Sequence, residues 1–322
     1  MKIVFHGNNA LTFLPGFRDQ LGEGHDITHL PDVLETEAQR AAYSAADVII
    51  GARLRAGLPV GQGLKLFHVP GAGYDGIDFA CLPADTPVCN CFGHEAAIAE
   101  YVMAALLARH VPLADADARL RRGDWTYWAG GPSGLRTELG AQSIGILGYG
   151  HIGKAVAARA AAFGMKVVVA NRSPVAAEGP VSAYMPLTDL PAFMGAADII
   201  VNTLPLAENT RGLVGAEALA AMRPEGVIVN VGRGAVISEL PLYEALLEGR
   251  IAGAILDTWY VYPSPDDPTP HPGTLPFHAL DNVVLTPHMS GWTHGTVARR
   301  AAAMAANVQR LAAGEALENR VR

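Results

Sequence analysis

The sequence predicts an α/β protein made of two doubly wound parallel-sheet domains, and three observations lead to this fold class. Short, wholly apolar runs alternate with Ala-rich segments of helical character along nearly the whole chain. Strands that are buried on both faces and separated by helices are typical of parallel sheets covered by helices on both sides. The runs fall into two groups, and a chain of 322 residues that is 50% hydrophobic is long enough to build two cores.

Each apolar run is predicted to form one strand, and the two groups are predicted to form one sheet each. The first group consists of MKIVF (1–5), ADVIIGA (46–52), LKLFHV (64–69) and TPVCN (86–90). The second group consists of SIGILG (143–148), KVVVAN (166–171), ADIIVNT (197–203), GVIVNV (226–231), GAILDT (253–258) and NVVLTPH (282–288).

A long helical pattern separates the two groups. It covers residues 95–123 and is predicted to be one helix that ends at Gly123, and the change of domain is placed at this helix. The Pro-rich stretch at 262–278 is predicted to be an irregular loop.

The last helix, at about 293–313, follows the final strand and can return to the first domain. We therefore expect residues 1–98 and 290–322 to form a substrate domain, and residues 99–289 to form a dinucleotide-binding domain.

Composition excludes several classes of protein. The formal net charge of -7 argues against a general nucleic-acid-binding surface, although a local basic pocket is compatible with it. The three cysteines, Cys81, Cys89 and Cys91, form neither an even disulfide framework nor a metal-ligand pattern, which favours a reducing compartment. There is no signal-peptide core and no apolar run of roughly 18 residues, so we expect a cytoplasmic protein without a membrane span.

The segment SIGILGYGHIGKAVAARAAAFGMKVVVAN carries the motif most characteristic of dinucleotide binding. Gly148, Gly150 and Gly153 form a GxGxxG pattern directly after an apolar run and directly before an Ala-rich helix. In a Rossmann-type unit these glycines let backbone N–H groups at the positive end of a helix approach a pyrophosphate. Residues 148–153 are therefore predicted to cradle a dinucleotide.

The residues that follow the next strand predict which dinucleotide is preferred. Asn171 lies 23 positions after Gly148, where an acid would accept hydrogen bonds from the ribose 2′-OH and repel a 2′-phosphate. Because Asn171 is neutral and Arg172 and Ser173 are donors, we expect NADP(H) to be preferred. The alternative is that Arg172 takes no part and NAD(H) is accepted as well.

Polar residues at the ends of three later strands point to the chemistry. They are Arg233 in VNVGRGAVISE, Asp257 in GAILDTWYVYP and His288 in LTPHMSGWT. Open parallel sheets bind ligands at this edge, and Arg with His suits the reduction of a ketone, which needs charge neutralised and a proton supplied. Together with HVPGAGYDGIDF and ADIIVNTLPLAENTRGLVG, these segments closely resemble the D-isomer-specific 2-hydroxyacid dehydrogenase family, from about Lys65 to about Ala312.

The resemblance implies a site in a cleft between the two domains. Arg233 matches the arginine that binds the substrate carboxylate and carbonyl, and His288 matches the general acid/base. Ala72 and Gly73 match the loop whose N–H groups receive the carboxylate, and Tyr262 also lies at the substrate. The residues expected to contact the cofactor are Gly148, Gly150, His151, Ile152, Gly153, Asn171, Arg172, Ser173, Leu204, Pro205, Thr210, Val231, Gly232, Asp257, His288 and Gly291. The implied activity is hydride transfer between NADP(H) and a small 2-oxo or 2-hydroxy acid such as glyoxylate or hydroxypyruvate.

Tyr262 departs from the family pattern. The family places a glutamate five residues after the aspartate, and this glutamate pairs with the catalytic histidine. Without it the pKa of His288 is expected near the unperturbed value of about 6.5, so reduction should weaken as the pH rises through roughly 6.5 to 7. Three alternatives stay open: Tyr262 holds the ring through its hydroxyl, Asp266 and Asp267 replace the glutamate, or Tyr262 never meets His288.

Two other functions compete with the reductase. The formate-oxidising branch of the family also lacks the glutamate, but the long amino-terminal extension associated with it is not found here. A dinucleotide-sensing corepressor of the same fold is the second, and the acidic balance argues against it. The stretch HEAAIAE lacks the second ligand of a zinc helix, so no metal is expected. DWTYWAGG resembles the family's dimer arm, and we expect a homodimer.

Overall fold

The computed structural model describes residues 1–264 and 267–322, which divide into two compact units. Unit 1 consists of Met1–His94 with Trp292–Arg322, and unit 2 consists of Glu95–Gly291. Each unit contains one sheet in which all neighbouring strands of the described chain run parallel. The predicted fold class, two doubly wound parallel-sheet α/β domains, is confirmed.

Unit 1 has a sheet with the strand order β2-β1-β3-β4-β5, which is the order of flavodoxin-like sheets. Its elements are β1 (Lys2–His6), α1 (Asn8–Leu11), α2 (Leu14–Leu21), β2 (Asp26–Leu30), α3 (Glu37–Ser44), β3 (Val48–Gly51), β4 (Leu66–His68), η1 (Phe79–Cys81), β5 (Val88–Cys89) and α10 (His294–Ala313).

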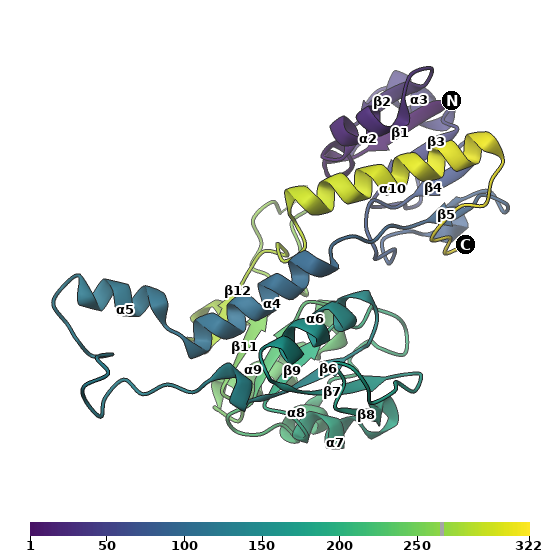
Figure 1. The fold of residues 1–322 in the computed structure, drawn as a ribbon. Helices are drawn as coiled ribbons and strands as arrows, with labels where there is room; N and C mark the ends of the chain where they lie inside the picture. Colours follow the sequence, from purple (N-terminus) through teal and green to yellow (C-terminus); the bar gives the residue numbers. More distant parts are fainter. Residues whose placement is uncertain (265–266) are drawn as a thin grey trace. The chain divides into compact units, whose positions relative to one another are not determined.

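Alternation along the strands of unit 1 fills both faces of its sheet. Ile3 and Phe5 pack on one face against α2 and α10, whereas Val4 packs on the other face with Tyr43 of α3. The closing helix α10 contributes Met304 to the first of these cores, and Figure 1 shows it as the long yellow helix of this unit. As expected, the last helix returns to the first group of strands.

Unit 2 has a sheet with the strand order β12-β11-β10-β9-β6-β7-β8. Its elements are α4 (Glu95–His110), α5 (Leu113–Leu120), η2 (Leu139–Ala141), β6 (Ser143–Leu147), α6 (His151–Ala162), β7 (Lys166–Asn171), β8 (Ala183–Pro186), η3 (Leu187–Asp189), α7 (Leu190–Gly195), β9 (Ile199–Asn202), α8 (Ala216–Ala220), β10 (Val227–Asn230), η4 (Gly234–Val236), α9 (Glu239–Leu247), β11 (Gly253–Leu256), η5 (Phe277–Ala279) and β12 (Val283–Leu285).

Helices cover both faces of the sheet in unit 2. One face packs against α4 and α6, where Val102 and Val156 meet Ile146 of β6. The other face packs against α7, α8 and α9, where Phe193 and Leu242 are fully buried. The inner strands β6, β9, β10 and β11 are therefore buried on both sides, which explains why they are apolar without alternation.

Three features differ from the sequence prediction. The predicted single helix over 95–123 is wrong: α4 ends at His110, and α5 runs only from Leu113 to Leu120. Pro112, which cannot continue a helical hydrogen-bond ladder, lies at the break and serves as the N-cap of α5. The strands β2 and β8 were not predicted, because both lie at sheet edges and are only partly apolar.

Within the described residues, no single helix has the length and apolarity needed to cross a membrane. The pair α4 and α5 satisfies that criterion only when the two are taken together across their bend of 45°.

Candidate active site

The parallel strands of unit 2 bring the predicted site residues of this unit to one edge of the sheet. Because all these strands point the same way, their carboxyl ends lie side by side. The segments that follow them carry, in spatial order from β12 to β7, His288, Asp257, Arg233, Leu204, Gly148 and Asn171. The strand order reverses between β9 and β6, and open α/β sheets bind ligands at such a switch point.

The glycine turn after β6 has the backbone that a dinucleotide cradle needs. Gly148 has φ +95°, and a Cβ there would lie 2.9 Å from Leu204 Cδ2, so only glycine fits without strain. A Cβ on Gly153 would lie 2.2 Å from the carbonyl oxygen of Gly148, which keeps α6 close to β6. A Cβ on Gly150, the N-cap of α6, would meet no atom within 4 Å. Space is therefore open at the positive end of the helix, where a pyrophosphate fits.

Asn171 connects the glycine turn to the loop that follows β7. Its Oδ1 accepts from the Tyr149 backbone N–H at 3.2 Å, and its Nδ2 donates to the Ser173 carbonyl at 3.0 Å. Both ends of the amide are thus engaged within the protein, so the side chain shapes the turn and the loop. Arg172 and Ser173 are exposed, and no carboxylate of the described chain lies within ion-pair distance of Arg172.

A cavity of about 660 Å³ lies beside this loop. One of its lining residues is a lysine that was not among the predicted site residues. Tyr149, Lys154 and Asn171 line it together with residues 174–176 and 178–180. The Lys154 ammonium lies 5.9 Å from the centre of the Tyr149 ring. Lys154 directly follows the third glycine of the motif, which is the signal that could have identified it.

A buried pair of asparagines, also missed, fixes the ends of β9 and β10. Asn202 Nδ2 donates to Asn230 Oδ1 at 2.9 Å, and both residues are almost fully buried. Asn202 Oδ1 accepts from the Leu204 N–H at 3.1 Å, and Asn230 Nδ2 donates to the Arg233 carbonyl at 3.1 Å. The pair therefore sets the backbone at Leu204 and Arg233, two of the predicted site residues.

Thr210 stabilises the cofactor-side loop after β9. Its hydroxyl donates to the Pro205 carbonyl at 2.7 Å and accepts from the Ala207 N–H at 2.8 Å. Among the predicted cofactor residues, Thr210 thus has a structural contact that holds Pro205 in place.

Asp257 holds the loop that carries His288. Its side chain is fully buried at the end of β11, and it accepts from Thr286 Oγ1 at 2.6 Å and from the backbone N–H groups of Met289 and Ser290 at 2.9 Å each. Tyr101 of α4 lies 2.7 Å from Thr286 Oγ1 and extends this network. Burial raises the pKa of Tyr101 and the Thr286 hydrogen bond lowers it, with the Asp257 charge raising it further. Tyr101 therefore stays protonated at neutral pH.

His288 has a strained backbone and a hydrogen-bonded ring. Its φ of 57° lies in the left-handed region, which is uncommon for a residue with a Cβ and is found preferentially at functional sites. The Tyr262 hydroxyl lies 2.9 Å from His288 Nδ1, and the Trp259 backbone N–H donates to the same hydroxyl at 3.1 Å. The alternative in which Tyr262 never meets His288 is therefore wrong.

Asp266 and Asp267 are the two carboxylates considered as replacements for the missing glutamate. Asp266 lies outside the described residues. Asp267 Oδ1 accepts from the Thr269 N–H at 3.3 Å.

The predicted carboxylate loop belongs to unit 1 and is described within that unit. It follows β4, and the buried Asn90 donates through Nδ2 to the Ala72 carbonyl at 2.7 Å. The Cys91 N–H donates to the Gly71 carbonyl at 3.1 Å. These two bonds fix the backbone that carries the N–H groups of Ala72 and Gly73.

Comparison with known proteins gives the same family as the motifs. The family model described as "D-isomer specific 2-hydroxyacid dehydrogenase, NAD binding domain" matches residues 103–290. Glyoxylate/hydroxypyruvate reductase B of Pectobacterium carotovorum subsp. carotovorum (strain PC1) is 34% identical over 274 residues, which cover 83% of this chain and 78% of that protein.

Two solved structures resemble the whole chain. An acyclic imino acid reductase in complex with NADPH and D-Arg has a TM-score of 0.80 and 26% identity, and the match covers 100% of both chains. An NADPH-dependent glyoxylate/hydroxypyruvate reductase from Sinorhizobium meliloti, in complex with NADP and malonate, has a TM-score of 0.79 and 26% identity over 99% of this chain and 96% of that one. The match of the family model to most of unit 2, together with the 34% identity, shows that this chain belongs to the D-isomer specific 2-hydroxyacid dehydrogenase family and is an enzyme that uses a nicotinamide dinucleotide.

Proposed function

We propose that the protein is an NADPH-preferring reductase of small 2-oxo acids, with glyoxylate and hydroxypyruvate as its first candidate substrates. The observation that carries this proposal is the row of residues at one sheet edge, which runs from the glycine turn through Arg233 and Asp257 to His288. The names of similar proteins support the substrate class: the Pectobacterium relative and the Sinorhizobium meliloti enzyme are both called glyoxylate/hydroxypyruvate reductases.

The chain's own residues bind and polarise the oxo acid. The Arg233 guanidinium offers a planar fork of donors, which suits a carboxylate with an adjacent carbonyl oxygen better than a lysine ammonium does. The N–H groups of Ala72 and Gly73, in unit 1, are further donors that we propose for a carboxylate. His288 donates a proton to the carbonyl oxygen through Nε2 as negative charge develops there. The reduced nicotinamide, when bound, supplies the hydride.

The preference for NADPH rests on charge at the end of β7. Asn171 is neutral, so a 2′-phosphate meets no repulsion there. The exposed Arg172 and Ser173 follow it, and Lys154 lines the same cavity as Asn171. Arg172, Lys154 and the Ser173 hydroxyl are the donors that we propose for a 2′-phosphate, and Glu178 lines the same cavity as Lys154.

Reduction of 2-imino acids is a second candidate, favoured by two observations. The imino acid reductase resembles this chain over its full length with a TM-score of 0.80. In addition, the histidine has a neutral tyrosine as its partner. A protonated C=N group carries its own proton, so its reduction needs a weaker acid than the reduction of a ketone does.

Steady-state oxidation of NADPH with a panel of 2-oxo acids, each with and without ammonium, tests both candidates. We expect turnover of glyoxylate and hydroxypyruvate, and a loss of kcat/KM of about 10²-fold or more in His288→Asn. Turnover that requires ammonium throughout would replace the first candidate by the second. Tight NADPH binding with no turnover of any substrate would contradict both.

We also propose that the protein is a homodimer, assembled through α5 and the segment that follows it. In Figure 1 this part of unit 2 extends away from the unit's own sheet. Trp125 and Trp128 are 64% and 59% exposed, and Leu113 is 73% exposed. Apolar side chains of this size exposed together are a liability in a monomer and are typical of an interface.

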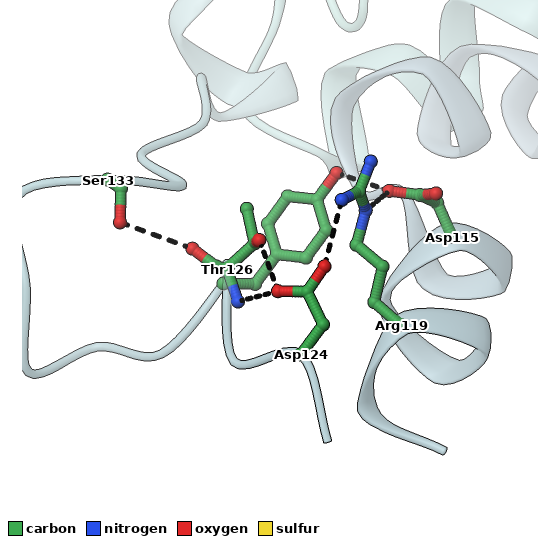
Figure 2. A network of polar contacts seen from close by, with 6 residues as sticks. Asp115, Arg119, Asp124, Thr126 and Ser133 are labelled. Carbon is green, nitrogen blue, oxygen red and sulfur yellow. Dashed lines mark hydrogen bonds and ion pairs between the residues drawn. The ribbon is translucent and has the colours of Figure 1, made fainter. Parts of the chain in front are cut away.

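A polar network gives this segment a defined shape before it meets a partner. Figure 2 shows Arg119 between Asp115 and Asp124, at 2.6 and 3.0 Å. Asp124 Oδ1 also accepts from the N–H and hydroxyl of Thr126, and the Tyr127 hydroxyl donates to Asp115 at 2.8 Å. These bonds restrain the aromatic segment, and such restraint reduces the entropy lost when a second copy binds.

A further inference from the structure

Tyr262 and His288 form a hydrogen-bonded pair at the position for which the family resemblance implies a glutamate beside the histidine. We propose that Tyr262 is the positioning residue of His288 and fixes its neutral ring in the tautomer that carries the proton on Nε2. The effect of this tautomer on turnover rests on the proposed function. The tautomer itself can be tested without that function.

The hydrogens available to the three groups determine the tautomer. The backbone N–H of Trp259 is a donor only, and it points at the Tyr262 oxygen from 3.1 Å. The Tyr262 oxygen is also 2.9 Å from His288 Nδ1. With the Trp259 N–H directed at the Tyr262 oxygen, the proposal assigns the Tyr262 Oη–H to Nδ1 of His288, which is then unprotonated. A neutral imidazole has one hydrogen, so it then resides on Nε2.

The Tyr262 hydroxyl is held by a rigid part of unit 2. Trp259 is 5% exposed, and its indole Nε1 donates to the Thr286 carbonyl at 2.7 Å. A Cβ on Gly234 would lie 2.3 Å from the Trp259 carbonyl oxygen, so the chain is closely packed there. The backbone N–H that orients Tyr262 is thus fixed by packing on both sides, and Asp257 fixes the loop that carries His288.

A hydroxyl and a carboxylate have opposite effects on the charge of the ring. A carboxylate attracts the imidazolium and accepts from Nδ1–H, whereas the tyrosine hydroxyl donates to the neutral ring and adds no charge. Titratable groups of the described chain that follow or contact the neighbouring strands β10 to β12 include Asp257 at the end of β11, Tyr101 of α4 and Arg233 after β10. Asp257 accepts three hydrogen bonds from residues 286–290, and the contact to Nδ1 of His288 comes from Tyr262.

Nitrogen NMR of the protein labelled with ¹⁵N-histidine tests the tautomer without substrate or cofactor. The His288 signals are assigned by their loss in His288→Gln. Above pH 8 we expect Nδ1 to show the shift of an unprotonated nitrogen and Nε2 that of a protonated one. In Tyr262→Phe, which removes only the hydroxyl, both nitrogens should move toward the average of two tautomers. An Nδ1-protonated ring in the parent, or an unchanged ring in Tyr262→Phe, overturns the proposal.

The pH dependence of turnover tests what the tautomer does. Tyr262→Phe should lower kcat by about tenfold, the value of one hydrogen bond, with little change in the KM for NADPH. Tyr262→Glu should restore kcat and move the pH at which reduction is half-maximal upward by about one unit. Tyr260→Phe, a change in a partly buried neighbouring tyrosine, is the control and should leave the profile in place. The proposal is contradicted if Tyr262→Glu and the parent have the same pH profile. If no form of the protein turns over, the proposed function is contradicted, and the NMR result alone decides the tautomer.

Discussion

Asp257 is a buried side chain that holds the loop of a proposed catalytic residue, His288, through hydrogen bonds. A buried carboxylate is costly unless its charge is compensated by donors, and here three donors from residues 286–290 converge on it. These bonds hold His288 in a left-handed backbone conformation that costs of order 1–3 kcal/mol by itself. The sequence places Asp257 beside the cofactor, but only the structure shows that it holds the loop of His288.

The residues at the end of β7 allow a direct test of cofactor choice. Arg172→Ala should reduce kcat/KM for NADPH by about 10- to 100-fold, the range of a charge-assisted hydrogen bond, and leave kcat/KM for NADH nearly unchanged. Asn171→Asp keeps an acceptor for the Tyr149 N–H and should act in the same direction, because its charge repels a 2′-phosphate.

Steady-state kinetics with both cofactors measures these effects. Lys166→Ala changes an exposed cation at the other end of the same strand and serves as the control. Equal use of NADH and NADPH by the parent enzyme would show that the preference has been assigned wrongly.

Sequence patterns identify residues whose role follows from their place at the end of a strand. They miss residues whose role depends on a contact with a residue far away in the sequence. Gly148, Arg233 and His288 could be predicted because each follows an apolar run at the ligand edge of a sheet. The pairing of Asn202 with Asn230 joins residues 28 positions apart on neighbouring strands, so no local pattern reveals it. The contact of Tyr262 with His288 was one of three alternatives, and no local pattern could select it because the two residues are 26 positions apart.

Among the secondary-structure elements, those with the most buried residues were the most predictable. The strands β6, β7, β9, β10 and β11 are apolar because helices cover both their faces, and all of them were predicted. The edge strand β2 has the sequence DITHL and is only partly buried, so its pattern does not differ from that of a loop. The apolar composition of 95–123 continues through Pro112, which is why one helix was predicted where the chain forms two.

A buried histidine links strand β4 to helix α10 and predicts an acid-sensitive unit 1. His68 Nε2 accepts from Asn307 Nδ2 at 3.0 Å. The Asn307 side chain cannot exchange its amide oxygen and nitrogen without losing a hydrogen bond, because Oδ1 accepts from the Glu318 N–H at 2.9 Å. His68 must therefore stay neutral. Burial lowers the pKa of His68 to about 4, and a hydrogen bond to the Val69 carbonyl opposes the shift.

The direction of the pH effect follows from the sign of this shift. The unfolded chain binds the proton at about pH 6.5 and the folded unit only near pH 4, so stability is complete above pH 6.5 and is lost as the pH falls toward 4. The loss amounts to about 3 kcal/mol over the whole window. Urea unfolding of the parent and of His68→Gln at several pH values should show a shallower loss in the variant, with the exposed His271→Gln as control. Parallel pH dependences in all three proteins would exclude His68 as the source.

At the scale of the whole molecule, two groups of apolar runs predicted two sheets, and the structure contains both. The strand orders could not be predicted, because a parallel strand can add on either side of a growing sheet after a helical crossover. The aromatic segment after α5 was predicted to face a second copy, and its tryptophans are exposed in the single chain.

The assembly is tested by the mass of the protein in solution. Trp125→Ser combined with Trp128→Ser should convert a dimer of the parent into a monomer at micromolar concentration, as measured by light scattering after size exclusion. Leu240→Ser combined with Leu247→Ser changes two similarly exposed side chains on α9 and should leave the dimer intact. A monomeric parent, or dissociation by both double variants alike, would contradict an interface at α5.

The fate of a deuterium label tests the central claim most directly, which is hydride transfer to a 2-oxo acid held by Arg233 and protonated by His288. The protein is given NADPH with deuterium at both C4 positions and hydroxypyruvate, whose product, unlike that of glyoxylate, has a chiral carbon. The account predicts D-glycerate with one deuterium at C2, and at least a 10²-fold slower reaction in Arg233→Gln and in His288→Asn at saturating NADPH. Unlabelled product, L-glycerate, or variants as fast as the parent would contradict it.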